Sequence, residues 1–71
     1  MLPIRFAVAP SPSGWKLQRD LRLVSIHATR QQAIKMADLL AQKDATRGRE
    51  SEISIHNGDG SVMRWVRGEG S

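Results

Sequence analysis

The chain has 71 residues, which suits one small domain with a modest core. It contains no cysteine, so neither a disulfide nor a thiolate metal site holds it together, as expected for a cytoplasmic protein. Eleven lysines and arginines against seven acidic residues give a formal net charge of +4, and no apolar run approaches the roughly 20 residues that span a bilayer. We predict one domain over residues 1–71, with an ordered core at about 4–67 and a flexible tail at 68–71.

Two strands and a turn are predicted at the start of the chain. Apolar residues at alternate positions predict a strand over residues 4–9. Five turn-forming residues at 10–14 then predict a loose connection to a second strand at 15–19. In that strand Trp15 and Leu17 share one face, which we predict to be the core face.

A third strand is predicted over roughly residues 23–26, and its start is ambiguous. Leu21 and Leu23 have one parity, whereas Val24 and Ile26 have the other. Either a bulge interrupts the strand between them, or the preceding turn extends to about Leu21.

One amphipathic helix follows. Thr29 and Gln32 fit a capping box at its start. Apolar residues then recur at spacings of three and four and form one stripe, made of Ala33, Ile34, Ala37, Leu40 and Ala41. The pattern ends near Ala45, and Gly48 is placed to close the helix. Leu39 lies off the stripe, so it is either a rim residue or a contact for a partner.

A last hairpin is predicted from strands at 52–56 and 61–66 and from the turn formers Asn57-Gly58-Asp59-Gly60 between them. The predicted fold class is therefore α+β, with a single helix packed on one face of a mainly antiparallel sheet, in the order β-β-β-α-β-β.

The turn also predicts the register of this hairpin. A type I turn over residues 57–59, with Gly60 in the left-handed position, pairs Ile55 with Met63 and Ile53 with Trp65. All four apolar residues then share one face, so we predict Met63 and Trp65 to be in the core.

Several short motifs resemble a known family. They are Gly14-Trp15-x-Leu17, Thr29 before a helix with Ala33-Ile34 and Ala37, Leu40-Ala41, and Ile55-His56-x-x-Asp59-Gly60. From about Phe6 to Arg64 the chain resembles the small prokaryotic family catalogued as domain of unknown function 2188. That family has no established activity, so the resemblance implies a compact sheet-plus-helix module and no catalytic residues.

The two histidines, His27 and His56, do not predict a catalytic or metal site. With Asp59 they make at most three scattered groups, whereas a metal needs three or four converging ligands and a general base needs an orienting partner and a pocket. We predict no enzyme activity, cofactor or metal, and interpret His56, Asp59 and Gly60 as a turn or functional motif.

Two functions remain as hypotheses for a small binding module. The favoured one is a protein-interaction or self-assembling module, such as a homodimer, that uses an exposed strand edge or the Leu39 side of the helix. The alternative is nucleic-acid binding by the sheet face that the helix leaves open, together with the Arg47–Arg49 loop. Its predicted contacts are Arg5, Lys16, Arg47, Arg49, Arg64 and Arg67. Neither hypothesis involves a membrane.

Overall fold

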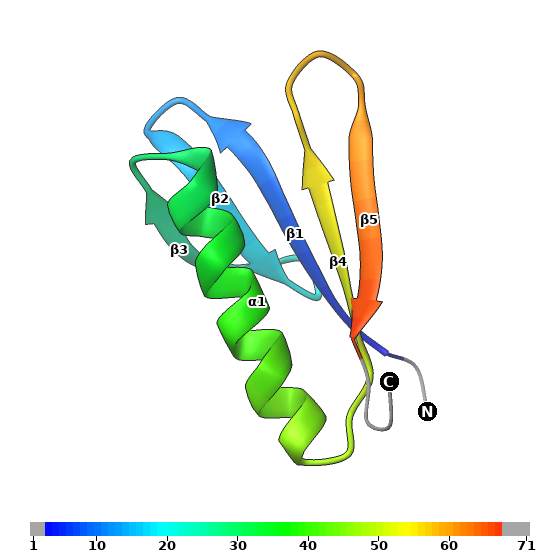
Figure 1. The fold of residues 1–71 in the computed structure, drawn as a ribbon. Coiled ribbons are helices and arrows are strands. Elements are labelled where there is room, and N and C mark those ends of the chain that lie inside the picture. The colour runs from blue at the N-terminus through cyan, green and yellow to red at the C-terminus, as the bar shows by residue number, and fades with distance from the viewer. Residues whose placement is uncertain (1–2, 68–71) are drawn as a thin grey trace.

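The computed structural model describes residues 3–67, so the predicted tail at 68–71 lies outside the described residues. Within them the elements are β1 (Ile4–Ser11), β2 (Gly14–Arg19), β3 (Arg22–His27), α1 (Arg30–Thr46), β4 (Ser51–His56) and β5 (Val62–Arg67). The strands form one sheet in the order β3-β2-β1-β4-β5 (Figure 1). β1 and β4 are parallel and the other neighbours are antiparallel. The predicted α+β class and element order are confirmed.

The core lies between α1 and the face of the sheet that this helix crosses (Figure 1). The helix contributes Ala33, Ala37 and Ala41, which are fully buried and small enough to let its backbone approach the strands. The sheet contributes the fully or almost fully buried side chains Ile4, Phe6, Val8, Leu17, Ile53 and Ile55. Trp15, Ile34, Leu40 and Trp65 pack around them, so the predicted helix stripe and the placement of Trp65 are confirmed.

The first turn is tighter than predicted. β1 continues through Pro10 to Ser11 and pairs with β2 up to Gly14, so the loose connection over residues 10–14 is wrong. Proline is tolerated here because the pairing of β1 with β4 has already ended at Val8, and its missing N–H removes no bond to that neighbour. At Gly14, φ is +136° and a Cβ would lie 2.4 Å from the carbonyl oxygen of His27, so this position requires glycine.

Both explanations of the parity change before α1 are correct. The turn between β2 and β3 extends to Leu21, and it holds Asp20 and Leu21 at φ values of +49° and +72°. The β2–β3 register also shifts between Leu17 and Gln18, which leaves Val24 as the extra residue of a bulge. β3 is one residue longer at each end than predicted.

The predicted register of the last hairpin is confirmed, but its turn type is wrong. Ile53 pairs with Trp65 and Ile55 pairs with Met63, and Gly60 adopts the left-handed conformation at φ +93°. Gly58 also has a positive φ, +84°, whereas both central residues of a type I turn have negative values.

Met63 is not in the core, although it lies on the predicted face. It is 49% exposed, because α1 covers the middle of the sheet and Met63 lies beyond the start of the helix on an outer strand. The Arg30 side chain at the start of the helix contacts it, with its Nη2 donating to the Met63 Sδ at 3.2 Å. Burial at this position therefore depends on where the helix begins, not on strand alternation alone.

Both ends of the helix are capped at the residues that the sequence predicts. Thr29 Oγ1 accepts a hydrogen bond from the backbone N–H of Gln32 at 3.1 Å. At the other end Gly48 has φ +77° and donates to the carbonyl of Ala45, while Arg49 donates to the carbonyl of Asp44. This pair of bonds is a Schellman motif, in which a left-handed glycine turns the chain away from the helix.

Candidate functional site

The histidines do not form a shared site. His27 lies on the helix side of the sheet, where its Nε2 is 2.8 Å from the hydroxyl of Ser25. His56 lines a groove on the opposite face, so the sheet separates the two rings. Among residues 3–67, no cluster of three or more potential metal ligands occurs, and no helix in this part of the chain is long and apolar enough to cross a membrane.

Asp59 and Gly60 shape the last turn. The Asp59 carboxylate accepts hydrogen bonds from the hydroxyl of Ser61 at 2.6 Å and from its backbone N–H at 2.9 Å. These two bonds, the hydroxyl bond first, lower the pKa of the Asp59 carboxyl group below its ordinary value. The geometry fits a turn-stabilising role, whereas His56 lines the groove on the face of the sheet opposite the helix and so belongs to a different surface.

The face of the sheet opposite α1, which we call the open face, carries a groove of about 720 Å³. Its lining combines the small side chain of Ala7 with polar and charged side chains of the neighbouring strands. The groove contains cations and carboxylates together. Arg64 Nε lies 3.3 Å from Glu52 Oε1, so one of the predicted phosphate contacts already has a partner of opposite charge.

The six cations predicted to contact nucleic acid are divided between two sides of the molecule. Arg5, Arg49 and Arg64 line the open-face groove, and strand alternation places Lys16 on the same face. Arg47 lies instead beside the end of α1, and Arg67 pairs with Asp38 on the helix. They therefore do not form one continuous track for a phosphate backbone.

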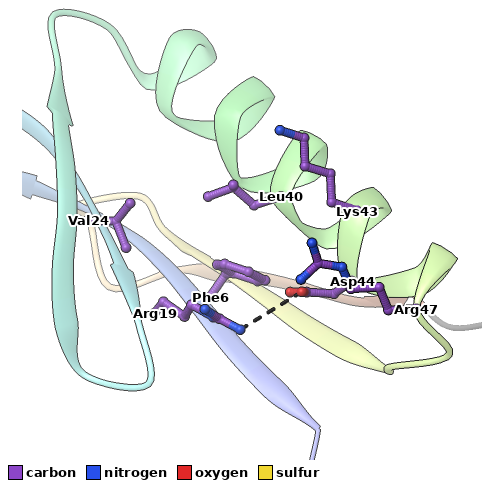
Figure 2. Close-up of a pocket in the computed structure, with 7 residues that line it drawn as sticks. All are labelled: Phe6, Arg19, Val24, Leu40, Lys43, Asp44 and Arg47. Carbon is purple, nitrogen blue, oxygen red and sulfur yellow. Dashed lines mark ion pairs between the residues drawn. The ribbon is translucent and has the colours of Figure 1, made fainter.

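A second cavity, of about 270 Å³, lies between the end of α1 and the sheet (Figure 2). Its lining residues are Phe6, Arg19, Val24, Leu40, Lys43, Asp44 and Arg47. Arg19 Nη2 lies 3.9 Å from the buried Asp44 carboxylate. The cavity is smaller than most ligand sites, and cations near the last turn of a helix balance its dipole, so we interpret these charges as structural.

The outer strand β3 exposes apolar side chains on both faces of the sheet. Leu23, Val24 and Ile26 are between 46% and 59% exposed, and the central residues 23–26 carry no charge. The apolar surface continues on α1 at Met36 and Leu39, which line a hollow of about 280 Å³ beside His27. We call Leu23, Val24, Ile26, Met36 and Leu39 the β3 edge surface.

The opposite outer strand, β5, is protected by charge. Arg64 extends from one face of it toward Glu52, and Arg67 extends from the other toward Asp38. Charged side chains along an edge oppose pairing with another chain. In β3 only the terminal residue Arg22 and the ring of His27 are ionisable, so β3 is the less protected edge.

The sequence predicts only part of this surface. It identifies Leu39 as a rim residue or partner contact, and an exposed strand edge as a way to bind a partner. It does not identify Leu23, Val24, Ile26 or Met36. The available signal was the change of parity between Leu23 and Val24, since a strand with apolar residues on both faces needs cover on both sides.

These observations define a class, a small α+β domain with one apolar, weakly protected strand edge. The chain belongs to the family described as "Uncharacterized protein conserved in bacteria (DUF2188)", whose profile matches residues 6–64. The resemblance found in its motifs is therefore confirmed. No curated protein and no solved structure matches the chain.

Proposed function

We propose that this protein is a small cytoplasmic, non-enzymatic interaction module that binds its partner by adding a strand to β3. The observation that supports the proposal is the uncharged and half-exposed run of residues 23–26 on an outer strand. In strand addition, main-chain hydrogen bonds supply affinity and the alternating side chains supply specificity.

The side chains of β3 offer a moderate binding energy. Covering the exposed halves of Leu23 and Ile26 is worth about 1 kcal/mol for each residue, and Val24 adds a similar amount on the helix side. Met36 and Leu39 extend the same surface. A partner that reaches from the strand onto the helix gains more than one that contacts the strand alone.

Nucleic-acid binding is supported less well. The open face mixes Arg5 and Lys16 with the carboxylates of Glu52 and Asp20, and two of the six predicted cations are in ion pairs. A phosphate backbone is bound mainly by unopposed cations that release counterions, so its binding would weaken steeply with salt. Strand addition at an uncharged edge has no such dependence.

A capped peptide of alternating valine and threonine is a suitable probe of an available edge. Titrated into ¹⁵N-labelled protein, it should shift the amide resonances of β3 and its neighbour β2. The Ile26→Lys variant should lose these shifts, because it places a charge in the middle of the edge. Val66→Lys is the matched control, since Val66 is similarly exposed but lies on β5.

Two results would overturn the proposal. One is the absence of any amide shift at millimolar peptide, measured at a protein concentration where analytical ultracentrifugation shows a monomer, so that no second copy occupies β3. The other is that the shifts occur at β5, or persist in Ile26→Lys. A parallel titration with a single-stranded oligonucleotide tests the alternative, which requires salt-sensitive shifts around Arg5 and Arg64.

A further inference from the structure

This inference rests on the proposed function and names the partner. We propose that β3 binds the β3 of a second copy of this chain, antiparallel and about a twofold axis, with Leu23 opposite Ile26 of the second copy. The two sheets would then join into one continuous sheet with both α1 helices on the same face. Such an interface uses the same surface on both copies.

Each residue of β3 can be assigned to one face of the sheet. Leu23 pairs with Gln18, which lines the open-face groove, and strand alternation places Ile26 beside Lys16 on that face too. The other four residues lie on the helix side. Three are placed there by their partners in β2, since Arg22 pairs with Arg19, Ser25 with Leu17 and His27 with Trp15. Val24 is placed there because it lines the cavity of Figure 2.

The order of faces along β3 is the same in both directions. From Arg22 to His27 it runs helix, open, helix, helix, open, helix, because the bulge puts Val24 and Ser25 on one side. When the strand is paired with an antiparallel copy of itself, Leu23 opposite Ile26 also sets Arg22 opposite His27 and Val24 opposite Ser25. Every pair then joins residues of the same face.

The neighbouring registers fail this test. A shift by one position sets Leu23 opposite Ser25 or His27 of the second copy, which joins an open-face residue to a helix-side residue. In a strand without a bulge, every second register would match faces. The bulge at Val24 therefore reduces the choice to one register near the centre of the strand.

The backbone at Leu23 fits this pairing. Arg19 and Arg22 flank the two-residue turn at Asp20 and Leu21 and form the closing pair of the hairpin. Because hydrogen-bonding direction alternates along an antiparallel ladder, the next residue, Leu23, directs its N–H and C=O away from β2. These groups are available to a strand on the outer side.

The exposed apolar side chains set an upper limit to the apolar part of the interface. The five side chains of the β3 edge surface are 38–59% exposed, which amounts to apolar surface on the order of 400 Å² per chain. This is about half of the roughly 800 Å² per partner of a standard interface, so the main-chain hydrogen bonds between the two β3 strands must supply part of the affinity. Met36 and Leu39 line the hollow beside His27, on the helix side of the same edge.

The chain has no cysteine, so single-cysteine variants can report the register directly. Leu23→Cys and Ile26→Cys proteins are mixed under mild oxidation, with one of them ¹⁵N-labelled so that mass spectrometry assigns each disulfide. Opposite Cα atoms lie about 5.5 Å apart, within disulfide range, whereas like positions are three residues out of register. The mixed disulfide should exceed either homodisulfide by about tenfold. A mixture of Val62→Cys and Val66→Cys on β5 is the matched control and should give none.

The outcomes separate this inference from the proposed function. Homodisulfides as abundant as the mixed product would overturn the register. Self-pairing would be overturned if no cross-links form and analytical ultracentrifugation shows only a monomer at protein concentrations up to about 1 mM. A dissociation constant above about 1 mM is too weak to be useful. If the valine–threonine peptide still binds β3 in that case, the proposed function stands with a different partner; if it does not, both fail.

Discussion

The turn between β2 and β3 allows a quantitative test through Leu21→Gly. Leu21 has φ +72° and is 91% exposed, so it is held in a left-handed conformation without compensating burial. Such a conformation costs an L-residue roughly 1–2 kcal/mol, and glycine relieves it at an entropic cost of about 0.5–1 kcal/mol. The variant should therefore raise the free energy of unfolding by about 0.5–1 kcal/mol.

Thermal and urea unfolding at micromolar concentration measure this change, because self-association is weakest there. For a chain of this size, 1 kcal/mol corresponds to about 4–8 °C in Tm, so the variant should melt about 2–8 °C higher. The fluorescence of Trp15 and Trp65, which pack against the core, reports the loss of tertiary structure.

Asp20→Gly is the matched control. It relieves a similar left-handed conformation, φ +49°, but removes the Asp20 carboxylate that accepts from the backbone N–H of Arg5 at 3.1 Å. That bond is worth about 0.5–1.5 kcal/mol, so this variant should gain nothing or lose stability. If Leu21→Gly is no more stable than the parent at any concentration, the strain argument is refuted. A loss that grows with concentration would instead assign Leu21 to the interface.

Three further changes test other parts of the structure. Ser51→Ala should raise the free energy of unfolding by about 1 kcal/mol in urea titration, because the Ser51 Oγ is fully buried and has no hydrogen-bond partner among the described residues; destabilisation would point to an unseen partner. Gly14→Ala should lower the free energy of unfolding by about 2–4 kcal/mol, because the added Cβ would overlap the carbonyl of His27. A change below 0.5 kcal/mol, which is about the error of such a titration, would contradict the turn geometry. An NMR titration should give Asp59 a pKa below its ordinary 3.8, so the stability it contributes is present above that pH and disappears as the pH falls through the lower folded-state pKa; Ser61→Ala should return the pKa toward 3.8.

The helix and the last register could be predicted because both depend on local chemistry. Thr29 caps the start of the helix and Gly48 adopts the left-handed conformation that ends it, so both act on neighbouring residues. The alanine stripe requires only a sheet to pack against. The pairing of Ile53 with Trp65 follows from alternation together with the glycine at position 60. These features are encoded within a few residues of where they act.

The rest depends on where elements lie relative to each other. Pro10 continues β1 because β4 stops short of it, which local sequence does not reveal. Met63 is exposed because α1 begins too far away to cover it. The parity change before Val24 is equally consistent with a turn and with a bulge, and here both occur.

The most consequential long-range feature is the strand order, since it decides which strands become edges. Parallel pairing of β1 with β4 places β3 and β5 at opposite margins, with comparable exposure of their apolar side chains. On β5 the arginines and their ion pairs interrupt the edge, whereas the middle of β3 has no charge. A lysine at Ile26 replaces a side chain that is already half exposed, but it lies opposite Lys16, and this like-charge pair should cost the monomer up to about 1 kcal/mol. A loss of association in Ile26→Lys can be attributed to the edge and not to the fold when urea unfolding of the variant shows a cost no larger than this.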